Sequence, residues 1–145
     1  DVLMARTRNS MLQAVPSSVV VSSAMTARGI TVVATLTKSK EIVITFPGNY
    51  LIKFVLNGSA TNLGIDGRIY KNGIAFGTLR TTNARGEEFS ETLGPWDRGD
   101  LCQLYVAYNA GAGTQSVSGF RIMGSYNNDS GIPIPAGKVT VDTAV

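Results

Sequence analysis

Two alternating runs separated by a proline–glycine turn dominate the chain between residues 41 and 56. Apolar side chains occupy every second position of both runs: Ile42, Ile44 and Phe46 in the first, and Tyr50, Ile52, Phe54 and Leu56 in the second. Alternation with a period of two, carried by β-branched and aromatic residues, indicates β-strands. The Pro47-Gly48 turn between the runs predicts two strands with a tight connection.

The same signals recur along much of the chain. Stretches rich in β-branched or alternating apolar residues predict further strands at 18–22, 30–37, 63–70, 74–80, 88–93, 101–108 and 116–124. The dipeptide Asn72-Gly73 predicts a β-hairpin, since both residues tolerate positive φ. In the run 88–93, the alternation places Glu91 on the same side as Phe89 and Leu93. Eight or nine strands with essentially no helix favour an all-β, two-sheet sandwich or jelly roll.

The length of 145 residues fits one domain. We expect an N-terminal arm at 1–16, a β-domain at 17–126 and a C-terminal extension at 127–145. The arm has mild helical character that ends at Pro16, and it is either a poorly ordered terminus or a segment that docks on a neighbouring subunit. The extension resumes β-compatible residues after two prolines, so it is either an extended tail or a strand added to a partner's sheet.

Composition excludes several classes of function. The chain contains no histidine and a single cysteine, Cys102, so Ser-His-Asp and Cys-His catalysis and the common zinc sites are excluded. Cys102 lies in an apolar run and is expected to be a buried small hydrophobic residue. No two acidic residues are spaced to flank a cleft, so we expect no enzyme, no metal and no cofactor. The net charge of +3 comes from scattered basic residues, and no apolar run is long enough for a membrane helix, so nucleic-acid binding and membrane insertion are not expected.

Four motifs occur in the order in which one known family has them. They are Phe46-Pro47-Gly48-Asn49-Tyr50-Leu51-Ile52, Ile69-Tyr70-Lys71-Asn72-Gly73, the run from Leu93 through Gly99-Asp100 to Leu104, and Ser116-Val117-Ser118-Gly119-Phe120-Arg121-Ile122. This order resembles the jelly-roll domain shared by the globular heads of the first complement component and by tumour-necrosis-factor-like proteins. The resemblance implies an antiparallel two-sheet jelly roll that assembles as a homotrimer, with aromatic residues near the threefold axis and a binding role instead of catalysis.

The chain also departs from that family. Among these 145 residues we find no collagen-like repeat, no apolar run like the membrane anchor of the necrosis-factor type and no clear counterpart of the family's calcium-binding loops. A short arm, a domain rich in Gly, Thr and Ser, and a trailing extension are similar in style to bacteriophage structural proteins. We therefore expect a virion structural or attachment module, such as a capsid decoration, fibre or tail component, that acts on the extracellular particle.

In this interpretation, residues 1–16 and 127–145 bind adjacent subunits or other virion proteins, and a host surface glycan or protein is a further expected partner. The alternative is a secreted, lectin-like domain that binds carbohydrate or protein. Fold alone does not decide between the two.

Five residues are candidates for contacts with other molecules. Tyr50, Tyr105 and Phe120 are candidates for the trimer interface, and the alternative is that they fill the core of one subunit. Trp96 and Arg98 lie in a Gly- and Pro-containing loop and are candidate recognition residues, because Trp and Arg are enriched at interaction hot spots. The alternative for Trp96 is a side chain folded over the end of the sandwich.

Overall fold

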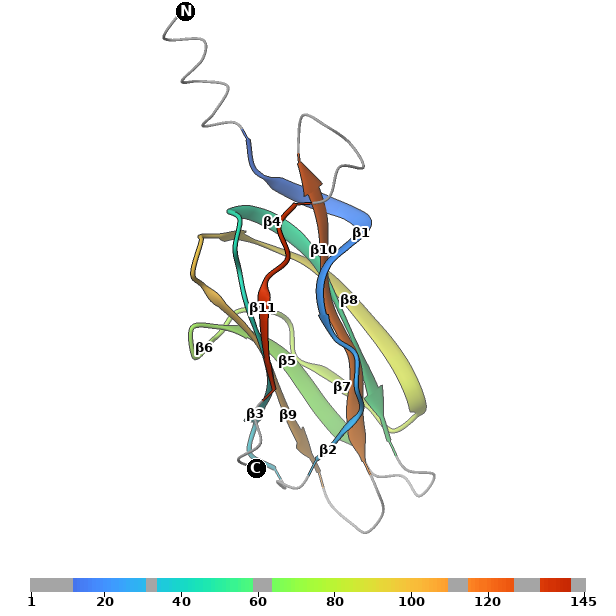
Figure 1. Cartoon of the computed structure of the whole chain (residues 1–145). Helices are drawn as coiled ribbons and strands as arrows, with labels where there is room; N and C mark the ends of the chain where they lie inside the picture. Colours follow the sequence, from blue (N-terminus) through green and yellow to red (C-terminus); the bar gives the residue numbers. More distant parts are fainter. Residues whose placement is uncertain (1–11, 31–33, 59–63, 110–114, 127–133, 142–145) are drawn as a thin grey trace, which may run out of the picture.

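Two β-sheets pack face to face in the computed structural model, which describes residues 12–30, 34–58, 64–109, 115–126 and 134–141 (Figure 1). All regular secondary structure among these residues is β-strand. The described residues therefore contain no helix that could span a membrane. The expected all-β sandwich is confirmed.

The first sheet contains β1 (Ala14–Ala24), β2 (Arg28–Gly29), β10 (Ser116–Tyr126), β4 (Gly48–Asn57) and β8 (Arg85–Trp96). Strand β10 pairs antiparallel with β1 on one side and with β4 on the other, and β8 pairs with β4. The second sheet contains β11 (Lys138–Val141), β3 (Thr37–Val43), β9 (Leu101–Tyr108), β5 (Ile65–Lys71), β6 (Ile74–Ala75) and β7 (Arg80–Thr82). Both β6 and β7 pair with β5.

The predicted strand pair at 41–56 is found, but its two members lie in different sheets. Strand β3 belongs to the second sheet and β4 to the first, so the Pro47-Gly48 turn carries the chain across the sandwich. Gly48 has φ 138°, and a Cβ on it would lie 2.3 Å from the backbone nitrogen of Ala14. Only glycine allows this close approach of β1 to β4.

One predicted strand is misplaced. In the described part of 30–37, Ile30 and residues 34–36 lie outside strands, and β3 begins only at Thr37. Ala34 has φ 65° and donates its N–H to the carbonyl of Tyr108 at 2.8 Å. This tertiary contact and turn override the β propensity of the surrounding sequence.

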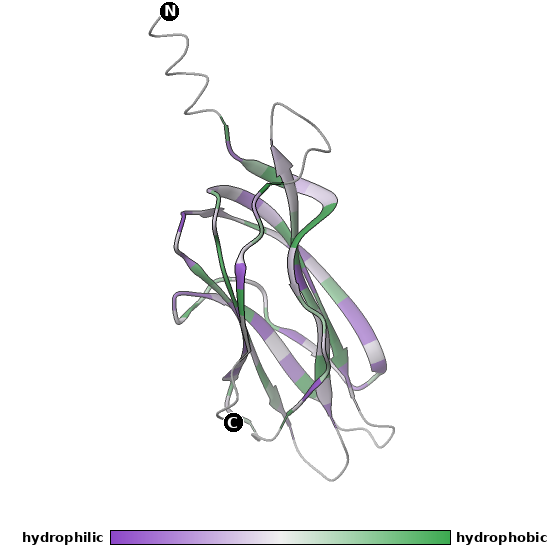
Figure 2. Ribbon diagram, in the orientation of Figure 1, coloured by the Kyte–Doolittle hydropathy of each residue, from purple (hydrophilic) through white to green (hydrophobic). Residues whose placement is uncertain are grey.

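Alternation along the strands builds the core between the sheets. Bands of hydrophobic and hydrophilic residues alternate along β5 and β8 (Figure 2). The largest buried side chains of the core cluster are Trp96, Tyr50, Phe120, Phe54, Ile42, Ile44, Ile52, Leu56, Ile65, Ile69, Leu104 and Ile122. Cys102 is fully buried, as predicted, and burial raises the pKa of its thiol.

The predicted hairpin is confirmed, but its second strand, predicted at 74–80, is limited to Ile74–Ala75, and residues 76–79 lie outside strands. Strands β5 and β6 pair antiparallel through Tyr70–Ala75 and Lys71–Ile74. Asn72 and Gly73 take φ values of 53° and 82°, the positive values that a two-residue hairpin turn requires.

The boundaries of the β-domain differ from those predicted at both ends. Strand β1 begins at Ala14, within the predicted arm, and residues 1–11 lie outside the described residues. Within the predicted extension, Lys138–Val141 forms β11, which pairs with β3 of the same chain, so this segment completes its own sheet instead of a partner's (Figure 1). The hydroxyl of Ser22 donates to the carbonyl of Gly137 at 2.8 Å and ties this segment to β1. Residues 127–133 and 142–145 lie outside the described residues.

Candidate functional site

Three segments meet at one end of the sandwich, which we call the Asp100 end: residues 44–47, the β5–β6 hairpin at 71–76, and residues 94–101, which connect the end of β8 to the start of β9. Backbone hydrogen bonds join them. Ile44 donates to the carbonyl of Asp100 and Gly99 donates to the carbonyl of Ile44, both at 2.8 Å, and Asn72 donates to the carbonyl of Leu101 at 3.0 Å. The loop that carries the predicted recognition residues is therefore held on two sides.

The carboxylate of Asp100 lies at the centre of these contacts. Its Oδ2 accepts the N–H of Asp97 at 2.7 Å, and its Oδ1 accepts a bond from the Asn72 side chain at 3.0 Å. The ammonium of Lys71 lies 3.5 Å from Oδ2. Burial opposes ionisation of Asp100, but these hydrogen bonds and the charge of Lys71 outweigh it, so the pKa of the carboxyl lies below its usual value. Asp100 thus stays charged and orders the loop.

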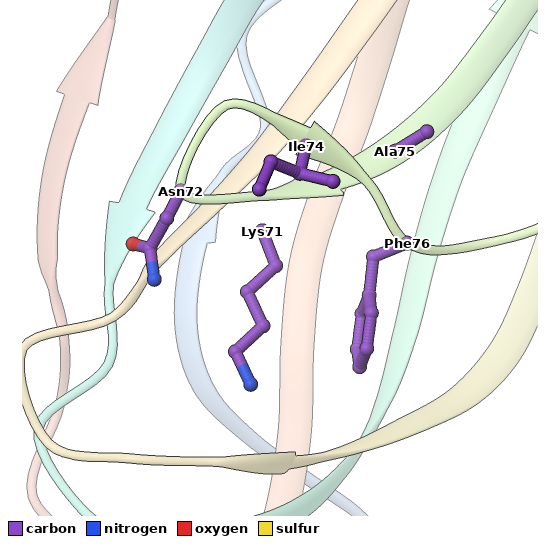
Figure 3. Close-up of a pocket in the computed structure, with 5 residues that line it drawn as sticks. All are labelled: Lys71, Asn72, Ile74, Ala75 and Phe76. Atoms are coloured by element: carbon purple, nitrogen blue, oxygen red, sulfur yellow. The ribbon is translucent and has the colours of Figure 1, made fainter.

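A small hollow of about 210 Å³ lies beside the hairpin and is lined by Lys71, Asn72, Ile74, Ala75 and Phe76. Figure 3 shows that the side chains of Lys71 and Phe76 extend from the hairpin in the same direction. The Lys71 ammonium donates to the carbonyl of Pro95 at 2.9 Å and lies 5.1 Å from the centre of the Phe76 ring. Because Lys71 also pairs with Asp100, its charge is already compensated within the chain.

Trp96 is fully buried at this end, which corrects the prediction that it is an exposed recognition residue. Its Nε1 donates to the carbonyl of Leu93 at 3.0 Å, and the Phe76 ring packs edge-on against it at 5.2 Å. The indole therefore closes the end of the sandwich, which was the alternative interpretation. Arg98, in contrast, is exposed.

A second hollow, of about 410 Å³, involves the loop that carries Arg98. It is lined by Val43, Ile44, Thr45, Arg98, Gly99 and Pro135.

The three predicted interface aromatics do not come together. Tyr50 and Phe120 are 1% and 0% exposed and face the interior of one subunit, so they cannot line an axis between subunits. The Tyr50 hydroxyl donates to the carbonyl of Phe46 at 2.6 Å, and burial with the nearby Tyr126 raises its pKa. Tyr105 lies half-buried in the second sheet, where its ring stacks on Tyr70 with the ring centres 3.8 Å apart. Of the three, only Tyr105 is open to a neighbour.

The sequence reasoning missed a buried cationic group, the Lys40 cluster, formed by Arg28, Ser39, Lys40 and Gln115. Lys40 is 1% exposed, and its ammonium donates to the carbonyl of Thr26 at 2.5 Å. Arg28 donates to the carbonyl of Ser39 at 3.1 Å. The buried Oγ of Ser39 and Nε2 of Gln115 have no hydrogen-bond partner.

Burial and the charge of Arg28 lower the pKa of Lys40. A signal for this residue exists in the sequence. Lys40 has the same phase as Ile42 and Ile44 in the alternating run, which places it on the inward face.

Among the described residues, no three acidic or cysteine side chains gather as they would around a metal ion. Comparison with known proteins found no protein-family model, no curated protein and no solved structure that matches the chain.

Proposed function

We propose that the chain is a non-enzymatic jelly-roll module that assembles as a homotrimer and serves as a virion structural or attachment protein, such as a capsid decoration, fibre or tail component. The order of the strands carries this proposal. One layer runs β1–β10–β4–β8 and the other β3–β9–β5–β7. The first sheet also contains β2, and the second also contains β6 and β11. Two antiparallel sheets between which the chain crosses repeatedly are typical of a jelly roll. The sequence resemblance implies the same fold and, with it, a trimer.

Tyr105 is the residue that we assign to the contact between subunits. In register it lies between Lys38 of β3 and Arg68 of β5, and its ring stacks on Tyr70. Aromatic residues and arginine are enriched in the buried parts of protein interfaces. A half-exposed pair of tyrosines beside Arg68 therefore supports contact through this face of the second sheet.

The contact is tested by Tyr105→Glu, which places a charge in the proposed interface. We expect the variant to keep the β-sheet circular dichroism of the parent chain and to sediment as a monomer. Leu79→Glu is the matched control, because Leu79 is also an exposed hydrophobic residue but lies outside the β9 face. A Tyr105→Glu chain with an unchanged native mass would refute the assignment of Tyr105.

Attachment to a particle is assigned to the terminal segments, 1–16 and 127–145. Because Ala14–Pro16 belong to β1 and Lys138–Val141 to β11, the residues left for this role are 1–13, 127–133 and 142–145. The test compares binding of the full chain and of a chain lacking residues 1–11 to the same purified particle. Equal binding would contradict the anchoring role of the arm.

The second candidate function is a secreted lectin-like domain that binds carbohydrate or protein. The hollow beside the exposed Arg98 favours it, since an open concave surface with a cation is suited to a small ligand. A glycan array separates the two candidates. Saturable binding to a defined glycan supports the lectin, and a purely structural module gives none.

A further inference from the structure

We propose that the hollow beside Arg98 binds a carboxylate attached to an apolar group about the size of a leucine side chain. We call this the Arg98 hollow, lined by Val43, Ile44, Thr45, Arg98, Gly99 and Pro135, with a volume of about 410 Å³. Pockets for small ligands in proteins begin at about this size. The proposal concerns a single subunit and does not depend on trimer formation.

The walls of the Arg98 hollow are fixed by hydrogen bonds. On one side, the Thr45 hydroxyl lies 2.8 Å from the carbonyl of Pro135 and 3.3 Å from that of Ala136. Ile134, just before Pro135, is buried in the core and anchors the segment. On the other side, the Gly99 N–H bonds to the carbonyl of Ile44 at 2.8 Å. The hollow is therefore formed before a ligand arrives, which lowers the entropic cost of binding.

Arg98 has no acidic partner among the described residues. Five other cations reach a carboxylate: Lys38 reaches Glu41, Lys53 and Arg121 reach Glu88, Lys71 reaches Asp100, and Arg80 reaches Glu91. Arg98 makes no ion pair with any described residue, and both oxygens of nearby Asp100 already accept hydrogen bonds. Its guanidinium is free to bind a carboxylate through two parallel hydrogen bonds.

Lys138 does not line the hollow, but it carries a second positive charge opposite one of the residues that do. It pairs in register with Val43, and directly opposed residues of two strands project from the same face. Lys138 is exposed and, like Arg98, forms no ion pair with the described residues. Two cations without acidic partners, close to the same apolar surface, indicate an anionic ligand.

The apolar surface of the Arg98 hollow determines which kind of anion fits best. Val43 and Pro135 present apolar surface, and Thr45 already bonds to two carbonyls. A sugar acid would leave several hydroxyl groups without partners on such a surface, which is costly. A carboxylate on an aliphatic group satisfies both the cations and the apolar surface. This chemistry occurs in free amphiphilic acids and in peptides that end in an apolar residue.

The test is a titration of the isotopically labelled full chain. Binding is monitored through the amide NMR signals of residues 43–45 and 98–99. We expect saturable shifts with N-acetyl-leucine, and about tenfold weaker binding of N-acetyl-leucinamide, which lacks only the charge. A tetrapeptide ending in leucine that binds more tightly than N-acetyl-leucine identifies a peptide terminus as the source, and equal affinity identifies the free acid. Equal binding of the acid and the amide, or tighter binding of N-acetylneuraminic acid, would overturn the proposal.

Variants locate the site. Arg98→Gln should weaken binding of N-acetyl-leucine by about tenfold. Lys138→Gln should weaken it by about threefold, because a lysine ammonium does not form the two parallel hydrogen bonds of a guanidinium. Arg85→Gln is the matched control, since Arg85 is exposed and makes no ion pair with the described residues. An Arg98→Gln chain that binds as well as the parent chain refutes the site. None of these results depends on the native mass, so failure of this site and failure of the trimer are separate outcomes.

Discussion

The Asp100 end and the Lys40 cluster both contain charged side chains in partly or fully buried positions. The charge is compensated at the Asp100 end and uncompensated in the Lys40 cluster. At the Asp100 end, the carboxylate accepts hydrogen bonds from Asp97 and Asn72 and lies beside Lys71. In the Lys40 cluster, the described contacts of the two cations are with backbone carbonyls, and two buried polar atoms have no partner. Compensated charge at the first end orders a loop, whereas uncompensated charge in the second costs stability.

The pKa shifts express this difference. The pKa values of Asp100 and of Lys40 are both lowered. For an acid, a lowered pKa means that the fold favours the charged form. For a base, a lowered pKa means that the fold disfavours the charged form. A lowered pKa therefore indicates that the fold stabilises the charge of Asp100 and destabilises the charge of Lys40.

Truncating the side chain that closes the Asp100 end should have the largest effect. Trp96→Ala removes a fully buried indole, and we expect the free energy of unfolding to fall by about 3–5 kcal/mol in equilibrium denaturation. Trp96→Phe, which keeps an aromatic ring, should lose less. If Trp96→Ala kept full stability and lost only ligand or particle binding, Trp96 would be a recognition residue after all.

Removing the buried charge of the Lys40 cluster should stabilise the chain. Lys40→Met keeps a long unbranched side chain, and we expect the free energy of unfolding at neutral pH to rise by about 1–3 kcal/mol. Lys53→Met is the control, because Lys53 lies 3.7 Å from Glu88 and is partly exposed, so its loss should give no gain. A Lys40→Met chain less stable than the parent would show that the ammonium is compensated.

Lys40 also predicts how stability depends on alkaline pH. The unfolded chain holds the proton up to about 10.5, the ordinary pKa of lysine, whereas the folded chain releases it at a lower pH. Between these two values the unfolded state binds more protons, so the free energy of unfolding should rise with pH. The rise should be smaller in Lys40→Met. Parallel pH profiles of the two chains, measured by denaturant unfolding, would contradict the shift.

Removing the negative charge at the Asp100 end should have a moderate effect on the free energy of unfolding. Asp100→Asn keeps the shape but removes the charge, and we expect a loss of about 1 kcal/mol. Since the folded chain lowers the pKa of Asp100 below 3.8, the contribution of Asp100 is complete above that pH and disappears as pH falls through the folded-state value. Asp97→Asn is the control, because Asp97 bonds to Asp100 through its backbone. Equal losses in both variants would contradict the central role of Asp100.

The smallest effect is expected from the unpartnered hydroxyl of Ser39. Ser39→Ala removes a buried polar atom that makes no hydrogen bond, so we expect a change between zero and a gain of about 1 kcal/mol. Ser118→Ala is the matched control, because the Ser118 hydroxyl accepts a hydrogen bond from Asn57 at 3.1 Å. Loss of this bond should lower the free energy of unfolding. A clear loss in Ser39→Ala would show that the hydroxyl has a partner in solution.

Local features of the fold could be predicted because they depend on neighbouring residues. Alternation located β4 and β10, and the positive φ tolerated by Asn72 and Gly73 located the hairpin. The phase of the run 88–93 placed Glu91 beside apolar residues, and the structure shows what this carboxylate does. Its oxygens accept bonds from the N–H and hydroxyl of Thr78, at 2.9 and 2.8 Å.

Features that depend on distant parts of the chain could not be predicted. Period-two alternation says which side of a strand a residue occupies, but not which sheet the strand joins, so the separation of β3 from β4 was missed. It also does not distinguish a core from an interface, and Tyr50 and Phe120 were therefore open to both interpretations. The Arg98 hollow includes Pro135, which lies more than thirty residues away along the chain, and local sequence patterns do not reveal such a meeting.

The Asp100 end and the Lys40 cluster both lie within one subunit, whereas the proposed virion role depends on the assembly of subunits. The native mass of the full chain, measured by analytical ultracentrifugation over a concentration series, tests that assembly most directly. We predict one stable species with three times the chain mass of 15.3 kDa. A monomer at every concentration would contradict the trimer, and with it the assignment of Tyr105 to a contact between subunits.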